Sequence, residues 1–302
     1  MKKNIYTSTN NFKGLDKRMY LLTLNEIHRH WGDENIFDWT FNNIIGGIST
    51  DIITYTDEFG KLIAGSAIVY RMIRFIDGNQ YHTGIMTGSW THPECRGKGF
   101  FTKIIHESIQ ISKKRGAKLL AAYVTQDNAS CSRLVQAGAS LYSSYYMFGD
   151  FKNTPINGEV PHSVEIMTEV DLRFLFSCCK SLFVYTFDEF VEQYINSPYK
   201  KYFLRVNNEY VIYTETYNAI KILFTTCKDL TSEIQCIKTL KMWCAKANKK
   251  QLFMFTCQPD IFDFCKSEGF NCHPGYLTYI QLDDSIPKIN LSGCNIYMAD
   301  KM

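Results

Sequence analysis

Gly88-Ser89-Trp90-Thr91-His92-Pro93-Glu94-Cys95-Arg96-Gly97-Lys98-Gly99-Phe100-Phe101-Thr102-Lys103 is the stretch that decides the fold. It predicts a strand, an exit marked by Pro93, a turn made by Arg96-Gly97-Lys98-Gly99, and an apolar helix that starts directly after the turn. Two glycines allow the backbone of a turn to approach a ligand closely. The free N–H groups of a helix's first turn attract anions, and the helix dipole adds to the attraction. The turn therefore suits a pyrophosphate, and Arg96 and Lys98 add positive charge.

The local pattern alone also fits a plain tight turn that binds nothing. It is not a P-loop, because no Gly-Lys-Ser/Thr sequence closes it, and it lacks the third glycine of a dinucleotide fingerprint. On the turn by itself, phosphate binding and a simple turn stay equal alternatives.

Around this stretch, the first half of the chain predicts a helix, three antiparallel strands, a helix, a strand, a short helix and a strand. The predicted ranges are Lys17–Trp31, Asp51–Thr56, Lys61–Ile76, Tyr81–Thr91, Phe100–Arg115, Lys118–Thr125, Ser130–Ala137 and Ser140–Phe148. The second half repeats this order loosely. Its ranges are Phe187–Ile195, Tyr202–Val206, Tyr210–Glu215, Lys221–Thr226, Ser232–Ala247, Gln251–Cys257, Ile261–Glu268 and Tyr276–Leu282.

The composition supports two domains. A chain of 302 residues is long enough for about two domains of ~150 residues. Residues 1–150 carry a net charge of +4 and residues 151–302 a net charge of −1, and nine of the 11 cysteines follow residue 150. The polar stretch Gly149–Gly158 has the composition of a linker. We therefore predict one domain over residues 1–150 and a second over residues 151–302.

Several classes of protein are disfavoured. The net charge of +3 is too small to indicate nucleic acid or an anionic membrane as the main partner. No run approaches the ~18 apolar residues of a membrane span, and polar residues 7–11 stand where a signal peptide needs its apolar core. The cysteines are odd in number and form no CxxC pair, so we expect neither disulfides nor a metal site. A cytoplasmic protein is expected.

Thr91–Phe100, which follows an antiparallel hairpin and precedes a long helix, resembles the acetyl-CoA motif of the GNAT acetyltransferase superfamily. In that motif a proline ends the fourth strand and Gln/Arg-x-x-Gly-x-Gly/Ala follows. Glu94 stands at the Gln/Arg position, a departure that weakens the phosphate contact but leaves its backbone donors. Downstream, Asp127–Ser130 with Leu134 and Gly138 resembles the second motif of the family, in which an asparagine opens the short helix after the fifth strand.

The resemblance covers about residues 17–148, and the element order recurs more faintly in residues 185–282, which lack the Arg-Gly-x-Gly turn. It implies a tandem GNAT protein with one working and one degenerate repeat. The implied fold class is α/β (α+β), with two GNAT-like domains that each consist of a mixed, mostly antiparallel sheet flanked by helices.

The resemblance also implies acetyl-CoA as co-substrate. The N–H groups of the turn and the helix start would hold its pyrophosphate, at Arg96, Gly97, Lys98, Gly99, Phe100 and Phe101. The pantetheine arm would run beside the fourth strand at Trp90, Thr91 and His92, and Asn128 would bond to its amide. A bulge in this strand typically frees an N–H for the thioester oxygen.

The residues for acid and base catalysis depart from the family. The tyrosine that many members use as the acid corresponds to Leu134, which cannot donate a proton. Tyr123, Tyr142, Tyr145 and Tyr146 lie on neighbouring strands and can replace it, although tyrosines in an apolar sheet more often belong to the core or to a cleft wall. For the base, His92 is the best titratable candidate, against the alternative of a solvent-facing loop histidine. The candidate catalytic residues are therefore His92, Tyr145 and Tyr146.

The function implied is an acetyl-CoA-dependent N-acetyltransferase that acts on a primary amine of a small molecule by direct attack on the thioester. The tandem layout favours an amino sugar or a sugar nucleotide as the acceptor, by analogy only. Two alternatives stay open, namely transfer to a peptide or protein amine, and a non-catalytic CoA-binding protein. The departures at Glu94 and Leu134 motivate the last of these.

Overall fold

The computed structural model describes residues 1–75, 78–151, 162–164, 168–206, 208–216, 219–246, 251–291 and 293–301. These residues form two compact units. Unit 1 comprises Met1–Tyr142 with Tyr276–Ser292, and unit 2 comprises Ser143–Gly275 with Gly293–Met302. Most of the predicted linker, residues 152–158, lies outside the described residues.

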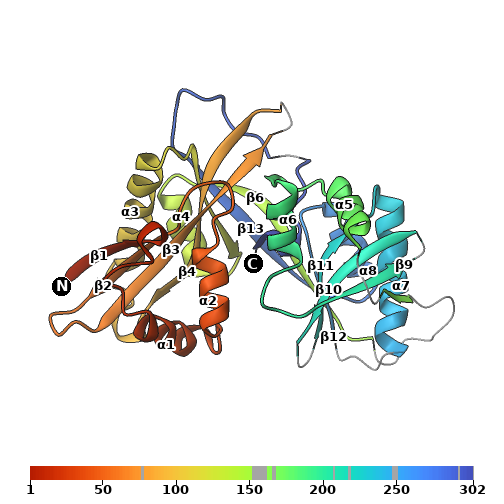
Figure 1. The fold of residues 1–302 in the computed structure, drawn as a ribbon, viewed down its shortest axis with the longest axis horizontal. Coiled ribbons are helices and arrows are strands. Elements are labelled where there is room, and N and C mark those ends of the chain that lie inside the picture. Colours follow the sequence, from red (N-terminus) through yellow and green to blue (C-terminus); the bar gives the residue numbers. More distant parts are fainter. Residues whose placement is uncertain are drawn as a thin grey trace. The chain divides into compact units, whose positions relative to one another are not determined.

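Unit 1 contains a six-stranded sheet and four α-helices (Figure 1). The strands are β1 (Lys2–Thr7), β2 (Asp51–Thr56), β3 (Leu62–Arg74), β4 (Gln80–Thr91), β5 (Leu119–Thr125) and the part of β13 (Asn271–Gln281) from Tyr276 on. The helices are α1 (Lys17–His28), α2 (Glu34–Asn42), α3 (Phe100–Lys114) and α4 (Ala129–Gln136), with short 3₁₀ turns η1 (Ser8–Asn10) and η2 (Pro93–Cys95).

The sheet of unit 1 has the order β1-β2-β3-β4-β5-β13. Strands β1 to β4 pair antiparallel, whereas β4 and β5 pair in parallel. A parallel pair needs a crossover connection, and α3 supplies it. Apolar residues of α3 at helical spacing, Phe100, Ile104, Ile105 and Ile111, are buried against this sheet. Each such side chain contributes about 1.5–3 kcal/mol when fully buried, so α3 is held firmly on the strands.

A buried ion pair fixes the far end of α3. The guanidinium of Arg115 donates to both carboxylate oxygens of Asp51 on β2, at 2.9 and 2.6 Å, and the Tyr70 hydroxyl donates to the same carboxylate at 3.0 Å. The Asp51 side chain is only 3% exposed. This pair and the apolar face together set the position at which α3 starts.

Unit 2 repeats the plan. Its strands are β6 (Ser140–Gly149, in this unit from Ser143), β7 (His162–Val164), β8 (Phe183–Val184), β9 (Lys201–Val206), β10 (Glu209–Glu215), β11 (Ala219–Thr225) and β12 (Gln251–Thr256). Its helices are α5 (Glu169–Cys178), α6 (Phe187–Tyr194), α7 (Leu230–Lys246) and α8 (Pro259–Ser267), with the 3₁₀ turn η3 (Met298–Lys301).

The sheet of unit 2 has the order β6-β12-β11-β10-β9-β7, and again one pair, β11 with β12, is parallel. Helix α7 makes the crossover between them, as α3 does in unit 1, and both β4 and β11 carry a register shift against the strand before them. The predicted fold class is therefore confirmed, with two mixed, mostly antiparallel sheets flanked by helices.

Each unit takes its last strand from the other half of the sequence. From Ser143 on, β6 belongs to unit 2, where it pairs with β12, and the later part of β13 belongs to unit 1. In unit 1 the Thr278 hydroxyl donates to the Ala122 carbonyl at 3.0 Å, and Leu282 N donates to Lys118 O at 2.8 Å. The predicted domains, residues 1–150 and residues 151–302, stay a prediction. They describe how the order of helices and strands repeats along the sequence.

Five of the helices and strands described have no counterpart among the predicted ranges. They are β1, α2, β7, α5 and β8. Helix α2 follows directly on α1 because Asp33 caps it, accepting from Ile36 N at 3.0 Å, and α5 begins with a capping box formed by Thr168 and Asp171. Both caps are signals that the sequence contains.

Gly84 tests the close packing of α3 on β4. A Cβ at this position would lie 2.6 Å from the Ser112 Oγ and 3.0 Å from the Ile68 Cγ2. Gly84→Ala should therefore lower the free energy of unfolding by about 1–3 kcal/mol through overpacking, measured by urea denaturation. The double variant Gly84→Ala with Ser112→Ala should recover most of the loss, with Ser112→Ala alone as control. An unchanged stability of Gly84→Ala would contradict this packing.

Candidate active site

The strand that leads into the candidate site, β4, contains a bulge. Thr87 lies opposite Ala67 and Trp90 opposite Gly65, so β4 has one more residue than β3 between these pairs. Gly88 has a φ of 54° there, which glycine adopts without a side-chain clash. A bulge leaves its extra residue outside the regular ladder. The resemblance to the GNAT superfamily implies a bulge of this kind in the fourth strand.

Strands β4 and β5 diverge after a short parallel ladder. The ladder ends at Met86 and Ala122, although β4 continues to Thr91 and β5 to Thr125. Past that point, the two facing edges are not paired with each other. Such edges can hydrogen-bond to an extended chain laid between them.

The connection from β4 to α3 is a turn with two glycines in the left-handed region. Gly97 and Gly99 have φ values of 77° and 76°. Gly99 is the N-cap of α3, no side chain caps this helix, and the Lys103 N–H is bonded to the Gly99 carbonyl at 3.1 Å. The N–H groups of residues 100–102 therefore have no partner within the helix. Together with the helix dipole they make this end of α3 attractive to an anion.

Positive charge lies at exposed positions of the turn. Arg96 and Lys98 are both exposed, and Arg96 Nε donates to the Thr91 carbonyl at 3.4 Å. The carboxylate of Glu94, which departs from the family motif, is 76% exposed and lies 3.8 Å from Lys61 Nζ. The nearby lysine offsets its charge, and the backbone donors of the turn stay available.

His92 lies directly before the turn with most of its ring covered. Its side chain is 13% exposed, Nε2 lies 3.8 Å from Glu26 Oε1 on α1, and Nδ1 lies 3.7 Å from Glu94 Oε2. His92 is thus not a freely solvated loop side chain. The two carboxylates lie near the two ring nitrogens, at distances longer than a hydrogen bond.

The aromatic residues around the turn are part of the core. Trp90 is 3% exposed, and its ring centroid lies 6.3 Å from that of Tyr20 on α1. Phe100 is 6% exposed and lies 5.6 Å from Tyr55, and Phe101 packs partly buried against the same cluster. A ligand at this strand and turn can therefore use their backbone groups, while the side chains hold the turn in place.

The second motif lies on β5 and α4. Asn128 caps α4, and its Oδ1 accepts from the Ser130 N at 3.0 Å and from the Ser130 hydroxyl at 2.7 Å. Leu134 is 2% exposed within the core of unit 1. The position at which the family places its acid is therefore an apolar core position here.

The structure places both candidate tyrosines of β6 in unit 2. The ring of Tyr145 lies 4.2 Å from that of Phe262, and the hydroxyl of Tyr146 accepts a hydrogen bond from Lys301. Burial raises the pKa of Tyr146 to about 12. The two tyrosines thus have partners in unit 2, whereas His92 and the glycine turn belong to unit 1.

The sequence did not predict two side-chain contacts near the end of β4. Glu26 on α1 lies beside His92, and the hydroxyl of Ser66 on β3 lies 2.7 Å from that of Ser89 at the bulge. Neither forms a motif with its partner, because the residues of each pair are far apart in the chain. Only their common position on the helix and strand next to β4 brings them together.

Residues 42–128, which include β2 to β5 and the glycine turn, match the family model of the acetyltransferase (GNAT) domain. This part of the chain is therefore similar to the GNAT domain. The comparison with curated proteins found no match.

Solved structures share the fold over nearly the whole chain. A tandem GNAT protein from the clavulanic acid biosynthesis pathway is 10% identical, with a TM-score of 0.64, and the match covers 94% of this chain and all of that one. A GCN5-related N-acetyltransferase from Anabaena variabilis is 13% identical (TM-score 0.61, 93% of this chain and 73% of that one). N-myristoyltransferase from Saccharomyces cerevisiae, solved with bound myristoyl-CoA, is 10% identical (TM-score 0.62, 92% and 82%). These likenesses establish the fold, and the resemblance to a tandem GNAT protein is confirmed. No helix in the described part of the chain is long and apolar enough to cross a membrane.

The second GNAT-like unit caps the corresponding helix with its own carboxylate. Four residues, Thr226–Asp229, connect β11 to α7, whereas eight residues, His92–Gly99, connect β4 to α3. The Asp229 carboxylate accepts from the Ser232 N at 2.8 Å, and this backbone bond lowers its pKa. An anion that belongs to the chain therefore already occupies the start of α7.

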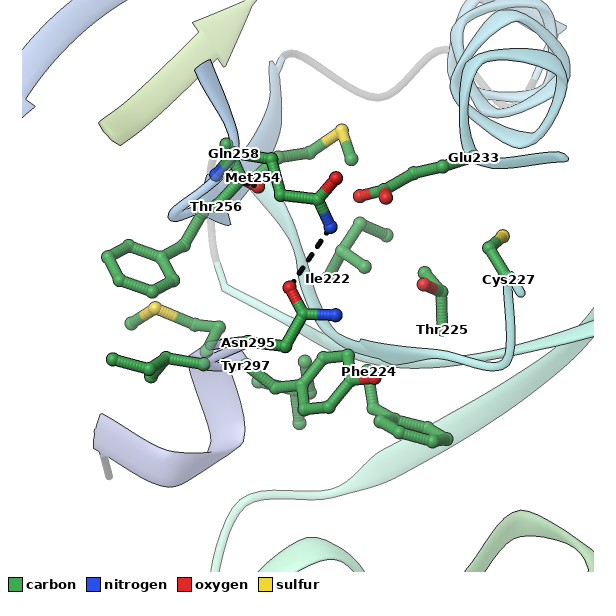
Figure 2. A pocket seen from close by; sticks show the side chains of 14 residues that line it. Ile222, Phe224, Thr225, Cys227, Glu233, Met254, Thr256, Gln258, Asn295 and Tyr297 are labelled. Carbon is green, nitrogen blue, oxygen red and sulfur yellow. Dashed lines mark hydrogen bonds between the residues drawn. The ribbon is translucent and has the colours of Figure 1, made fainter. Parts of the chain in front are cut away.

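The gap between β11 and β12 is walled by the C-terminal segment. The parallel ladder of these strands ends at Lys221 and Phe253, and past it lies a cavity of about 40 Å³ that residues 295–298 help to line (Figure 2). Gln258 Nε2 donates across the cavity to Asn295 Oδ1 at 3.0 Å. A space of this size is small for a ligand, and residues of the chain itself line it.

A buried carboxylate anchors this C-terminal segment. Asp300 is 4% exposed. It accepts hydrogen bonds from the Tyr194 hydroxyl at 2.5 Å, the Tyr185 hydroxyl at 2.8 Å, the Ser181 hydroxyl at 2.8 Å and the Tyr297 N at 2.7 Å. A buried carboxylate with its lone pairs satisfied is costly to remove from its donors. The segment is therefore a fixed part of unit 2.

Glu233 makes the stability of unit 2 dependent on pH. Its side chain extends from α7 into the cavity (Figure 2), and burial raises its pKa from 4.5 to about 7. Between these values the folded protein keeps a proton that the unfolded chain releases. The free energy of unfolding should therefore fall as the pH rises from 4.5 to 7, by on the order of 2–3 kcal/mol.

Urea denaturation of Glu233→Gln checks this prediction. The variant should match the wild type near pH 4.5 and exceed its stability at pH 7.5, because glutamine stays neutral. Glu169→Gln on α5, where the side chain is 70% exposed, is the control and should follow the wild type at both pH values. A constant difference between Glu233→Gln and the wild type across this range would refute the assignment.

Proposed function

We propose that this protein transfers an acetyl group from acetyl-CoA to a primary amine of a small molecule. The observation that carries the proposal is the uncapped start of α3 behind the Arg96–Gly99 turn, next to the point where β4 and β5 diverge. The GNAT description of residues 42–128 supports the same chemistry. We also propose that the protein acts in the cytosol.

Acetyl-CoA fits the residues of unit 1. The N–H groups of residues 97–101 would bind its pyrophosphate, with the side chains of Arg96 and Lys98 adding charge. The N–H of Arg96, which the sequence also suggested, already donates to the Pro93 carbonyl at 3.2 Å. The free edges of β4 and β5 would bind the pantetheine arm at Trp90, Thr91 and His92, and Asn128 would bond to its amide. The donor would then be held by backbone groups, whose positions the core side chains fix.

The proposed reaction is a direct attack of the amine nitrogen on the thioester carbonyl carbon. The new C–N bond forms as the C–S bond breaks, and the leaving thiolate takes a proton from water, while the proton that the amine loses goes to a base and from there to solvent. His92 would accept the proton that the amine loses, with the carboxylates of Glu26 and Glu94 near its ring nitrogens. An N–H at the bulge of β4 would donate to the carbonyl oxygen as negative charge develops there.

The acceptor is proposed from analogy. An amino sugar or a sugar nucleotide is favoured by the tandem layout, and a peptide or protein amine is the alternative within the same enzyme class. A second candidate function, CoA binding without catalysis, is favoured by the buried Leu134 at the position of the family's acid. A screen of amines for thiol release, including nucleotide-linked amino sugars and short peptides, separates these possibilities.

Gly99→Val tests the donor site. A valine cannot adopt the φ of 76° at the start of α3 without strain, so the N–H groups of the first turn should move. We expect acetyl-CoA to bind at least tenfold more weakly, measured by isothermal titration calorimetry. Gly116→Val is the matched control, because Gly116 has a φ of 79° and lies at the opposite end of the same helix. The donor site is wrong if the wild type binds no CoA, or if both variants bind it equally.

His92→Gln tests the proposed base. The variant should lose about 10²–10⁴-fold in kcat, the range for general acid–base catalysis, with little change in the KM for acetyl-CoA. His106→Gln, at an exposed position of α3, is the control. Unchanged turnover and an unchanged pH profile in His92→Gln would remove this residue from the mechanism.

A further inference from the structure

Two lysines project side by side from the sheet of unit 2. Lys201 on β9 pairs with Thr214 on β10, and Thr214 pairs with Lys221 on β11. Residues that are directly paired across neighbouring strands point to the same face of a sheet. Because neighbouring strands lie about 4.8 Å apart, the two lysine backbones are separated by about 10 Å. We call Lys201, Thr214 and Lys221 the lysine row.

The row faces away from α7. Ile220 and Ile222, the neighbours of Lys221 along β11, are buried in the cluster that includes α7, and side chains alternate between the faces of a strand. On the other side of Lys221, the same row continues to Phe253 on β12 and Phe148 on β6. The face thus combines a cationic part with an aromatic part.

A third lysine reaches this face from the C-terminal turn. Lys301 Nζ lies 3.9 Å from the ring centroid of Tyr146 and 4.2 Å from that of Phe255. Tyr146 and Phe255 pair with each other two residues along from Phe148 and Phe253, so they share the face of the row. Lys221 acts electrostatically on both Lys201 and Lys301.

The charge of the lysine row is not balanced by acids. None of the five residues of the extended row, from Lys201 to Phe148, is acidic. Lys201 Nζ donates to the Ser197 hydroxyl and, at 2.7 Å, to the Tyr199 carbonyl, which are both neutral. Within the described part of the chain, the ammonium of Lys221 forms no hydrogen bond or ion pair and lies 6.0 Å from the ring of Phe253.

Burial makes this arrangement costly. Both row lysines are half-buried. Burial lowers the pKa of Lys221, and burial together with Lys221 lowers the pKa of Lys201 to about 8. Desolvated like charges destabilise a fold unless a counter-charge offsets them. A bound oxyanion with several acceptor atoms is such a counter-charge.

We propose that the lysine row of unit 2 is a binding site for a phosphate-bearing small molecule. Lys201 and Lys221 contact the phosphate from two sides, and Lys301 lies toward the aromatic part of the face. The half-buried ring of Phe148, which packs on the buried Phe253 at 4.6 Å between ring centroids, offers the apolar surface on which the sugar or base of such a molecule packs. The site differs from the glycine turn in unit 1, since it consists of side chains on strands and not of backbone N–H groups at a helix start.

Titration with inorganic pyrophosphate and with ADP tests the site, by calorimetry on the full chain. Because the glycine turn of unit 1 is itself a proposed pyrophosphate site, the titrations are made in the Gly99→Val background. In that background we expect saturable binding of both probes, and at least a tenfold loss of affinity when Lys221→Met is added. Methionine keeps the length of the side chain and removes the charge, so the melting temperature of the variant should be equal to or above that of the wild type without ligand. Wild-type protein that binds neither probe would overturn the proposal.

Lys238→Gln is the matched control. This lysine is exposed on α7, and the substitution changes the net charge by the same amount. Added to Gly99→Val, it should leave the affinity for both probes within twofold. Equal losses in Lys221→Met and Lys238→Gln would mean that only the overall charge attracts the anion, and would also overturn the proposal.

A third arm separates this site from the proposed acetyl-CoA site. Gly99→Val should lose CoA but keep pyrophosphate and ADP, whereas Lys221→Met should keep CoA. If Lys221→Met also loses CoA, the lysine row is not a separate site, and the proposal is overturned. If Gly99→Val loses all probes, the lysine row binds none of them and the proposal fails, although the acetyl-CoA site stands.

Discussion

The parallel ladder of β4 and β5 covers only the first part of each strand. The proposed ligand site of unit 1 depends on the point at which this ladder ends. Within the ladder, which ends at Met86 and Ala122, the two strands satisfy each other's backbone groups. Beyond it they diverge, and the bulge at Gly88 accompanies the divergence. Because α3 must cross over from one strand to the other, its N-terminus starts next to the opening. An extended ligand with an anionic end meets free strand edges and free helix N–H groups in one place.

In unit 2 the parallel strands β11 and β12 also diverge, but the chain's own residues lie at the start of α7 and beside the gap. Asp229 caps α7, and residues 295–298 wall the gap. The architecture of both units is preserved, while the shorter connection and the C-terminal segment remove the opening. Whether a unit of this fold can bind an acyl donor such as acetyl-CoA thus depends on the connection after its fourth strand and on the segment that lines the gap. It does not depend on the fold alone.

Much of the fold could be predicted because the signals were local. Glycine and asparagine punctuation, alternating apolar residues and the helical spacing in Phe100–Lys114 mark the strands and helices near their observed bounds. Strand β1 has no such signal, because its residues are exposed or only half-buried. The exchange of β6 and β13 between units was not predictable, since a strand's pattern does not state which edge it joins.

The candidate site was only partly accessible to the same reasoning. The glycine turn is a continuous motif, so its uncapped helix start could be inferred from residues 96–101. The contact of Glu26 with His92 joins residues from α1 and from the end of β4, and it depends on how α1 packs on the sheet. The fixed partners of Tyr145 and Tyr146 depend on the assignment of β6 to unit 2.

Because each unit takes one strand from the other half of the sequence, the order in which the strands are synthesised affects when each sheet can form. Unit 1 includes residues 276–292, so its sheet stays one strand short until these residues have left the ribosome. During that interval β5 has an unprotected edge, a site at which other chains can add a strand. Nascent unit 2 can use β6 as soon as β12 is made, so we infer that the C-terminal unit closes its sheet first. The two sheets are thereby closed in the order opposite to that in which their first strands are made.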